Sequence, residues 1–549
     1  MRERGWGRDV WPWADESEAQ VRNWRTTPLR TAAQAGILLA VGLLALIPRL
    51  TDLDRPLTID EPVWFERSSR FGAALAAGDW GGTFQTGHPG VTTMWLGVVG
   101  MGLERAAALD GASLNRYAQE RWAAFLGARR AMALAASALI LLIALLVGQL
   151  FGLGAAALAG ALLALDPWLI AHGRILHLDG LLASLIAIVA LACLRRWLQP
   201  GGRRYVVLAG IAAGLALITK SAALVLLPAL LLLLAVPAGV RIGWRRWLAD
   251  LALLTGVAGA TAVVAWPALL VVPVSTVTQV LQFGSEVASQ PHENGSFFLG
   301  QQVGDPGLAF YPVVLAFRLS PLVIAGLLVW LITRARHQGG QPLSRDASFW
   351  LLLAAALVIL LMGMVAKKQD RYVLPAVPLL VIVAAVGSQQ ALAGWRAPHA
   401  TGRVGSSWRG RPSLQAIGIG VLGAAQLALS ASARPYFFDY YSPLAGGPVA
   451  ARWAIPVGWG EGLDLVGAYI NSQRGRDAPR VGAAGPVRIP LRPQVRGRVV
   501  DPAAGGPMDY LVTYVSAEQR GLDSPTGTER LAATVRIDGI TYAEVLRVS

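Results

Sequence analysis

Two acidic residues, Asp60 and Glu61, stand side by side in TIDEPVWFERSSRF (58–71), just after an apolar stretch of about membrane-spanning length. A carboxylate placed there could take the proton from an attacking hydroxyl group, which is general base chemistry. It could also cap the helix that Pro62 is expected to start, because carboxylates satisfy free N–H groups at a helix N-terminus. The pair alone leaves both interpretations open.

The connection DPWLIAHGRILHLDG (166–180) is rich in ionisable side chains although it joins two apolar segments. Ionisable groups at membrane depth are costly, so they usually face water, a partner or a substrate. An arginine that extends to the lipid interface would account for Arg174 alone. It would not account for His172, His177 and Asp179, so we expect these four residues to bind substrate.

A group of cations follows in AKKQDRYVLP (366–375), namely Lys367, Lys368 and Arg371. A bound phosphate is the simplest partner, since lysine supplies a point charge and arginine a planar fork. Attraction to lipid headgroups is the alternative.

Two isolated residues are weaker candidates for substrate binding. His88 lies in QTGHPGVTTMW (85–95), where a loop histidine is often structural, and Lys220 in LITKSAAL could line a cavity or cap a helix C-terminus. A divalent cation is one further option, because Asp60, Asp179, His88 and His177 could converge on it. No other cofactor is predicted.

The composition shows what positions these residues. The chain has 549 residues, of which 54% are hydrophobic and 15% charged, and its mean hydropathy is +0.49. This predicts a polytopic α-helical membrane protein with about eleven transmembrane helices. They are expected near 31–50, 130–150, 152–170, 179–196, 204–219, 221–239, 248–268, 309–333, 348–366, 372–391 and 413–433.

The arginine-rich loops predict the orientation, because short cytoplasmic loops retain Lys and Arg. They place the N-terminal segment 1–30 in the cytoplasm and the C-terminal region outside the cytoplasmic membrane. The net charge of +15 fits this topology and contact with membrane lipids, so nucleic acid is not an expected partner. Cys193 is the single cysteine, which excludes an internal disulfide.

Three long outer segments are predicted. Within the membrane domain, 31–433, they are the loop 51–129, with interfacial helices after the acid pair, and the loop 269–308. The third is 434–549, where MDYLVTYV and TVRIDGITYAEVLRV alternate apolar and polar residues as strands do. This predicts a small C-terminal α/β domain. No GxxxxGK[ST] or strand-linked GxGxxG suggests a nucleotide site.

The motifs TIDE, HPG, RILHLDG and KKQDRYVLP resemble those of GT-C membrane glycosyltransferases, in particular glycosyltransferase family 39. That group contains the protein O-mannosyltransferases and the related lipid A aminoarabinose transferases. The later stretches FFDYYSPLAGG, VGWGEGLD and IDGITYAEV look like the tails of bacterial, phospholipid-carrier-dependent members.

The resemblance implies an inverting transferase of the cell envelope that moves a sugar from a polyprenyl-phosphate donor to an acceptor hydroxyl on protein, lipid or glycan. It makes Asp60 the implied general base, with Glu61 as its companion. It matches His88, Arg174 and Asp179 to family positions and makes Lys367, Lys368 and Arg371 the implied contacts to the donor phosphate. The alternative is a transporter or flippase of a lipid-linked or anionic substrate, which would predict broken helices and an inverted repeat.

Overall fold

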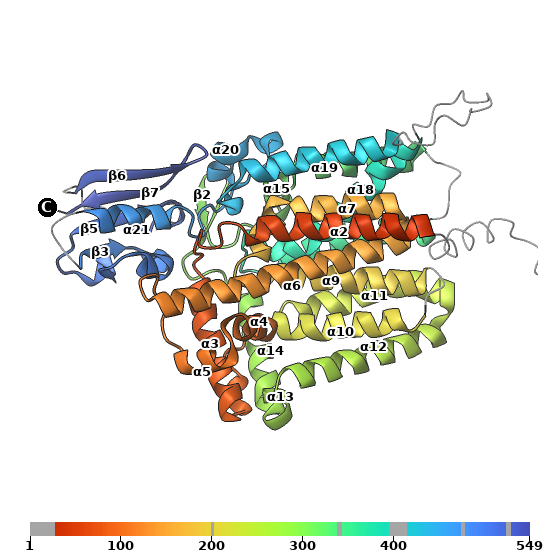
Figure 1. The fold of residues 1–549 in the computed structure, drawn as a ribbon, viewed down its shortest axis with the longest axis horizontal. Helices are drawn as coiled ribbons and strands as arrows, with labels where there is room; N and C mark the ends of the chain where they lie inside the picture. The colour runs from red at the N-terminus through yellow and green to blue at the C-terminus, as the bar shows by residue number, and fades with distance from the viewer. Residues whose placement is uncertain are drawn as a thin grey trace, which may run out of the picture.

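The computed structural model describes residues 28–198, 202–336, 343–394, 414–473, 478–522, 527 and 529–548. Long helices run roughly along the longest axis, and a small α/β domain caps one end of the bundle (Figure 1). Within the described residues, eight helices are long and apolar enough to cross a membrane. They are α2 (Pro28–Leu50), α6 (Gln119–Phe151), α9 (Asp179–Trp197), α11 (Ala223–Ile242), α12 (Trp244–Ala265), α17 (Ala347–Met364), η4 (Asp370–Ala376) continued by α18 (Val377–Gly394), and α19 (Leu414–Ser432).

Two predicted spans are bent. The helices α7 (Leu153–Leu165) and α8 (Pro167–Gly173) meet at 65°, and α15 (Phe310–Arg318) and α16 (Pro321–Arg336) meet at 112°. A proline begins the second helix of each pair, and the residue before a proline is disfavoured in helical conformation, which explains both breaks. If each pair counts as one span the total is ten.

The one remaining predicted span, 204–219, forms α10 (Arg204–Thr219), a shorter apolar helix of 16 residues. The prediction of a polytopic helical membrane protein is thus confirmed. Helix α9 is the most enclosed, with 94% of its apolar window buried, and it packs against α6, α10 and α11. Its first residue, Asp179, is therefore held in the interior of the bundle.

The segment after α2 folds into three helices, α3 (Glu61–Ala77), α4 (Val91–Met101) and α5 (Leu103–Leu109). Helix α3 begins one residue before the predicted start at Pro62, and its apolar side chains Trp64 and Phe71 are buried. Helix α6 begins at Gln119, earlier than the predicted span. This early start places Arg129 beside the acid pair.

The segment after α12 forms the short α13 (Ala268–Val271), α14 (Pro273–Ser289) and a hairpin of β1 (Ser296–Phe298) and β2 (Gln301–Val303). The end of α14 is bound to the segment after α17, since Ala366 N–H donates to the carbonyl oxygen of Ala288 at 3.0 Å. This bond brings the start of the segment 289–295, which leads to the hairpin, next to the residues that lead into η4.

The C-terminal domain contains a five-stranded sheet in the order β4-β3-β5-β7-β6. Its strands are β3 (Arg480–Ala483), β4 (Arg498–Val500), β5 (Tyr510–Tyr514), β6 (Arg530–Ile537) and β7 (Ile540–Arg547). The predicted strands correspond to β5, β6 and β7. Asp538 and Gly539 both have positive φ and close the β6–β7 hairpin. Helices α20 (Gly447–Ala454) and α21 (Leu463–Ser472) precede the sheet.

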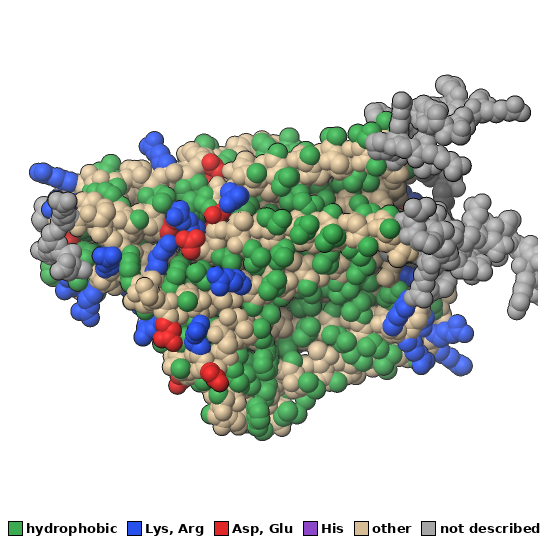
Figure 2. Space-filling view, viewed as in Figure 1, with side chains coloured by type: hydrophobic (Ala, Val, Ile, Leu, Met, Phe, Trp, Pro, Cys, Tyr) green, Lys and Arg blue, Asp and Glu red, His purple; other side chains and the backbone are tan. Residues whose placement is uncertain are grey.

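Charge is distributed unevenly over the surface. In Figure 2 the helical bundle shows a broad hydrophobic face, whereas acidic and basic side chains mix where the C-terminal domain begins, and basic side chains gather at the opposite end. Helix α12 starts at this opposite end (Figure 1), and its first turn contains Arg245 and Arg246. The apolar band between two charged ends is the surface expected of a protein in a bilayer.

Candidate functional site

A network of ion pairs joins three of the predicted regions. The Asp60 carboxylate contacts the Arg371 guanidinium, with Oδ2 and Nη2 2.9 Å apart. Arg371 Nε lies 3.3 Å from Asp179 Oδ2, and Lys220 Nζ lies 2.5 Å from Asp179 Oδ1. Asp179 and Lys220 are buried, whereas the side chain of Asp60 is 33% exposed. The sequence predicted these four residues to act on substrate, and the structure brings them together.

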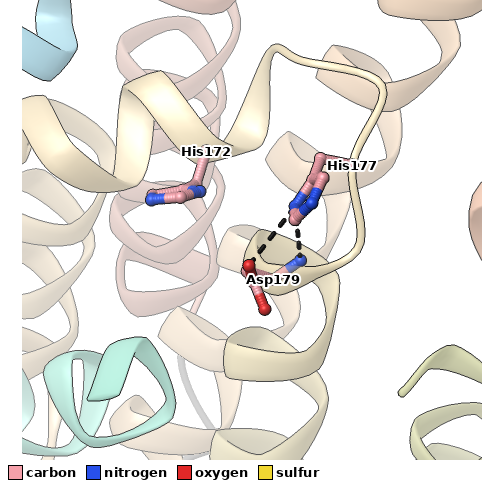
Figure 3. Close-up of side chains that lie close together, drawn as sticks. All are labelled: His172, His177 and Asp179. Atoms are coloured by element: carbon pink, nitrogen blue, oxygen red, sulfur yellow. Dashed lines mark hydrogen bonds and ion pairs between the residues drawn. The ribbon is translucent and has the colours of Figure 1, made fainter. Parts of the chain in front are cut away.

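His177 links the two carboxylates of this network. Its Nε2 lies 3.4 Å from Asp60 Oδ2, and its Nδ1 lies 3.3 Å from Asp179 Oδ2. In Figure 3 the His172 ring lies beside this pair and comes from α8, whereas Asp179 begins α9. The tight turn between the two helices thus collects both histidines and Asp179 at one point.

These three side chains also form the group best suited to hold a metal among the described residues, because their ligand atoms all lie within 4.8 Å of one another. The predicted set differed, since it contained Asp60 and His88 in place of His172. Lys220 and Arg371 already neutralise Asp179 from both sides. The donors therefore do not offer a divalent cation a negatively charged site, and no step below uses a metal.

His88 reaches the same region from the segment before α4. Its Nδ1 is 3.4 Å from the hydroxyl of Ser221, the residue after Lys220. The backbone is fixed there, because Gly90 N–H donates to the Thr219 carbonyl oxygen at 3.0 Å. Gly90 has a φ of 63°, and a Cβ on it would lie 2.1 Å from the Trp64 ring. The HPG motif therefore needs its glycine to bring His88 to Lys220.

The surroundings shift the pKa values of the polar groups outside the spans. Burial alone would raise the pKa of Asp60, but Arg371 and His177 outweigh it and hold this pKa below its ordinary value. Burial and the positive charge of Lys220 lower the pKa of His88 well below its ordinary value. Asp60 is therefore ionised and His88 neutral near pH 7.

Glu61 has different surroundings from Asp60. It is fully buried, and Arg129 Nε donates to its Oε1 at 2.7 Å while Arg129 Nη2 contacts Oε2. The backbone N–H groups of Thr58 and Leu176 also donate to it, at 3.0 and 2.9 Å. Glu61 thus ties the loop before α3 to α6 and to the 174–178 turn. Asp60, by contrast, occupies the N-cap position of α3 without making a capping bond.

Two other predicted substrate-binding residues have partners within the protein. Arg174 is buried, contacts the backbone oxygen of Asp52 and lies over the Phe437 ring, with its Cζ 5.3 Å from the ring centroid. Lys368 is buried and donates to Asp305 at 2.6 Å. Neither makes a described contact with Asp60 or Asp179. Lys367 is half-buried and has no ion pair within the described ranges.

Sequence reasoning missed two residues at the site, Arg129 and Trp459. The guanidinium carbon of Arg371 lies 4.4 Å from the Trp459 ring centroid, and the His177 ring meets the same ring edge-on at 5.1 Å. The Trp459 carbonyl oxygen accepts from Ile59 N–H at 3.0 Å. The C-terminal domain therefore forms one wall of the site. The stretch VGWGEGLD was noticed only for its resemblance to family tails.

Comparison with known proteins gives one family match. Residues 122–266, from within α6 to the residue after α12, match the family described as dolichyl-phosphate-mannose-protein mannosyltransferase. This agrees with the predicted resemblance and covers Asp179 and Lys220, but it includes neither Asp60 nor Arg371. No curated protein matches the sequence.

Solved structures show similarity at low sequence identity. ArnT from Cupriavidus metallidurans, bound to undecaprenyl phosphate, is 17% identical with a TM-score of 0.46, and the match covers 95% of this chain and 98% of that one. The oligosaccharyltransferase AglB from Archaeoglobus fulgidus, in complex with an inhibitory peptide and a dolichol-phosphate, is 12% identical with a TM-score of 0.48. That match covers 90% of this chain and 70% of AglB.

Proposed function

We propose that this protein is an inverting membrane glycosyltransferase that moves a sugar from a polyprenyl-phosphate donor to an acceptor hydroxyl. The observation that carries the proposal is the arrangement of Asp60, a partly exposed carboxylate, against the cation Arg371 within a set of buried ionisable groups. Such a pair suits a reaction in which one group accepts a proton while the other neutralises a leaving phosphate. The family match over 122–266 supports the same reaction class.

Asp60 is the base in this proposal because the other two carboxylates are enclosed. The Asp179 side chain is 2% exposed and faces cations on both oxygens, and Glu61 is fully buried by Arg129. Asp60 Oδ2 is engaged by Arg371 and His177, while its Oδ1 has no partner in the described part of the chain. Oδ1 is therefore the oxygen that takes the acceptor proton as the new bond to the sugar C1 forms.

The leaving group is stabilised by the cations nearby. As the bond between C1 and the phosphate oxygen breaks, the lipid phosphate departs with the electron pair, and Arg371 and Lys220 offset its charge in a partly dry site. Lys367 is the third cation in this role, whereas Lys368 is committed to Asp305. A single displacement inverts C1 and needs no nucleophilic carboxylate, so Asp179 serves to hold Lys220 and Arg371.

Donor binding also prepares the base. Arg371 holds the Asp60 pKa low, which makes that carboxylate a weak base. A donor phosphate competes for the Arg371 guanidinium, and the burial of Asp60 then raises its pKa. The base is thus strengthened when the sugar is in place.

The proposed location is the cytoplasmic membrane, with the N-terminus in the cytoplasm and the C-terminal domain outside. Arginines at the bundle end opposite the C-terminal domain support it, because short cytoplasmic loops retain positive charge. The site then lies at the outer boundary of the membrane, where a lipid donor and a hydroxyl acceptor can meet.

The test is mass spectrometry on the purified protein, incubated with a panel of polyprenyl-phosphate sugars and a membrane extract as the source of acceptors. The proposal expects one donor to be consumed and an acceptor to gain the mass of its sugar. Protein that is folded by its thermal unfolding profile yet consumes no donor would contradict it.

A further inference from the structure

Two adjoining cavities lie between the loop 289–304 and the C-terminal domain. The first, of about 360 Å³, is lined by residues that include Asn294, Arg488 and Arg492. The second, of about 350 Å³, is lined by residues that include Asn294, Gln302 and Arg520. Because they share Asn294, we treat them as one feature, the loop groove.

The two walls of the loop groove are fixed to each other. Leu299 N–H donates to the Ala454 carbonyl oxygen at 3.0 Å, which joins the β1–β2 turn to α20. A Cβ on Gly521 would lie 2.6 Å from Gln302 Nε2, so the hairpin also contacts the segment after Arg520 closely. The groove is therefore formed by contacts between the β1–β2 hairpin and the C-terminal domain.

The loop that lines the groove starts beside the segment that carries two of the proposed site residues. The bond from Ala366 N–H to Ala288 O places the start of the loop against the segment that carries Lys367 and Arg371. His292 lies near enough to feel these charges, since burial, Arg520 and Lys367 together lower its pKa to about 4. The 289–304 loop that lines the groove is thus tied at its start to the segment of the proposed site.

The charges of the groove are not balanced. Arg488 pairs with Asp501 at 2.6 Å, and Glu293 adds one exposed acid. The exposed Arg492 and the half-buried Arg520 have no ion pair within the described residues. Asn294 and Gln302 add amide groups that can bond sugar hydroxyls. An unpaired, partly buried guanidinium favours binding of an anion, particularly a planar carboxylate or a phosphate.

We propose that the loop groove binds the acceptor and that this acceptor is an acidic glycan, whose carboxylate or phosphate groups pair with Arg492 and Arg520. The acceptor hydroxyl would then enter the site past His292 and reach Asp60. This inference rests on the proposed glycosyl transfer and adds the chemical class of the acceptor to it.

The test measures binding to the full-length protein in lipid nanodiscs, with an oligosaccharide of hexuronic acid units and its carboxyl-reduced, neutral counterpart as probes. Wild-type protein should bind the acidic probe about tenfold more tightly, in keeping with two partly exposed charge pairs. The double variant Arg492→Gln/Arg520→Gln should lose that preference. Arg536→Gln, a matched change at an exposed position on β6 outside the groove, should keep it.

Three results would overturn the inference. The first is equal affinity of the wild type for both probes, and the second is an equal loss of affinity for the acidic probe in the double variant and in Arg536→Gln. The third is tighter binding of an acidic serine-containing peptide than of the acidic oligosaccharide. Donor consumption, measured separately, tells the two proposals apart. If the donor is consumed but the acidic probe is not preferred, only the proposal for the groove is rejected. If the acidic probe is preferred but no donor is consumed, the proposal of glycosyl transfer is rejected.

Discussion

Asp60 and Glu61 are neighbours in the chain, yet their side chains lie in two different kinds of surroundings. Asp60 is 33% exposed and belongs to a network with Arg371 and His177, in which its Oδ1 has no partner among the described residues. Glu61 is sealed from solvent, and Arg129 and backbone N–H groups occupy both of its oxygens. The difference shows that the partners of an acid, and not its type or position in a motif, decide whether it can react.

The start of α3 produces this division. A helix that begins at Glu61 turns successive side chains by about 100°, so neighbours at its first turn face different directions. Glu61 points to α6, and Asp60 points to η4. One motif therefore anchors the loop and supplies a reactive group.

The largest expected effect comes from breaking the buried pair of Glu61 and Arg129. Glu61→Gln leaves Arg129 as a buried charge without its counter-ion, which costs about 3–5 kcal/mol. We expect a marked fall in the thermal unfolding temperature in detergent. Glu66→Gln, which removes a partly exposed partner of Arg70 on the same helix, is the matched control and should change little. Equal unfolding temperatures in the two variants would contradict the anchoring role.

Arg371→Gln tests the network around Asp60, the partly exposed acid. It removes charged hydrogen bonds to the phosphate, each worth about 1.5–3 kcal/mol, so the donor KM should rise about tenfold or more. Steady-state kinetics with the identified donor measures this. A similar rise in Lys368→Gln would contradict the assignment, because Lys368 pairs with Asp305 and is buried away from the proposed phosphate position.

The pH dependence sharpens the account of Asp60. A base must be deprotonated, so activity falls as the pH drops through its pKa. Because Arg371 holds the Asp60 pKa low in the free enzyme, kcat/KM should keep its value to lower pH than kcat, which reports the donor-bound state. In Arg371→Gln the acid limb of kcat/KM should move to higher pH. If the acid limb of kcat/KM lies at the same pH in Arg371→Gln as in the wild type, the observed titration is not that of Asp60.

The smallest effect concerns Trp459, which contacts Arg371 and His177 from the C-terminal domain. A cation–π contact of about 0.5–2 kcal/mol predicts a loss in kcat/KM of about tenfold for Trp459→Ala, with Trp459→Phe retaining most activity. Trp453→Ala changes a tryptophan of α20 that is 70% exposed, and it should have little effect. Equal losses at both positions would indicate general damage to the domain.

The sequence was sufficient for the membrane helices and for the last three strands, because hydropathy and alternation report burial directly. It was also sufficient to name Asp60, Asp179, His177, Lys220 and Arg371, because ionisable residues in apolar surroundings are conspicuous. It could not distinguish these residues from Arg174, which contacts backbone oxygen, and Lys368, which pairs with Asp305. Such contacts depend on tertiary packing.

The same limit explains the missed residues. Arg129 lies in a helix whose early start has no local signal, and Trp459 is nearly 400 residues from Asp60 in the chain. Only the docking of the C-terminal domain brings the tryptophan to Arg371. Long-range contacts of this kind leave no periodic pattern in the sequence.

The most direct test of the central claim is a single turnover of Asp60→Asn with donor already bound. This variant keeps the size of the side chain but removes the proton acceptor. The account predicts donor affinity within a few-fold of wild type and a transfer step slowed by about 10²–10⁴, the usual worth of a general base. Transfer at the wild-type rate in the first turnover would contradict the assignment of Asp60 as the base.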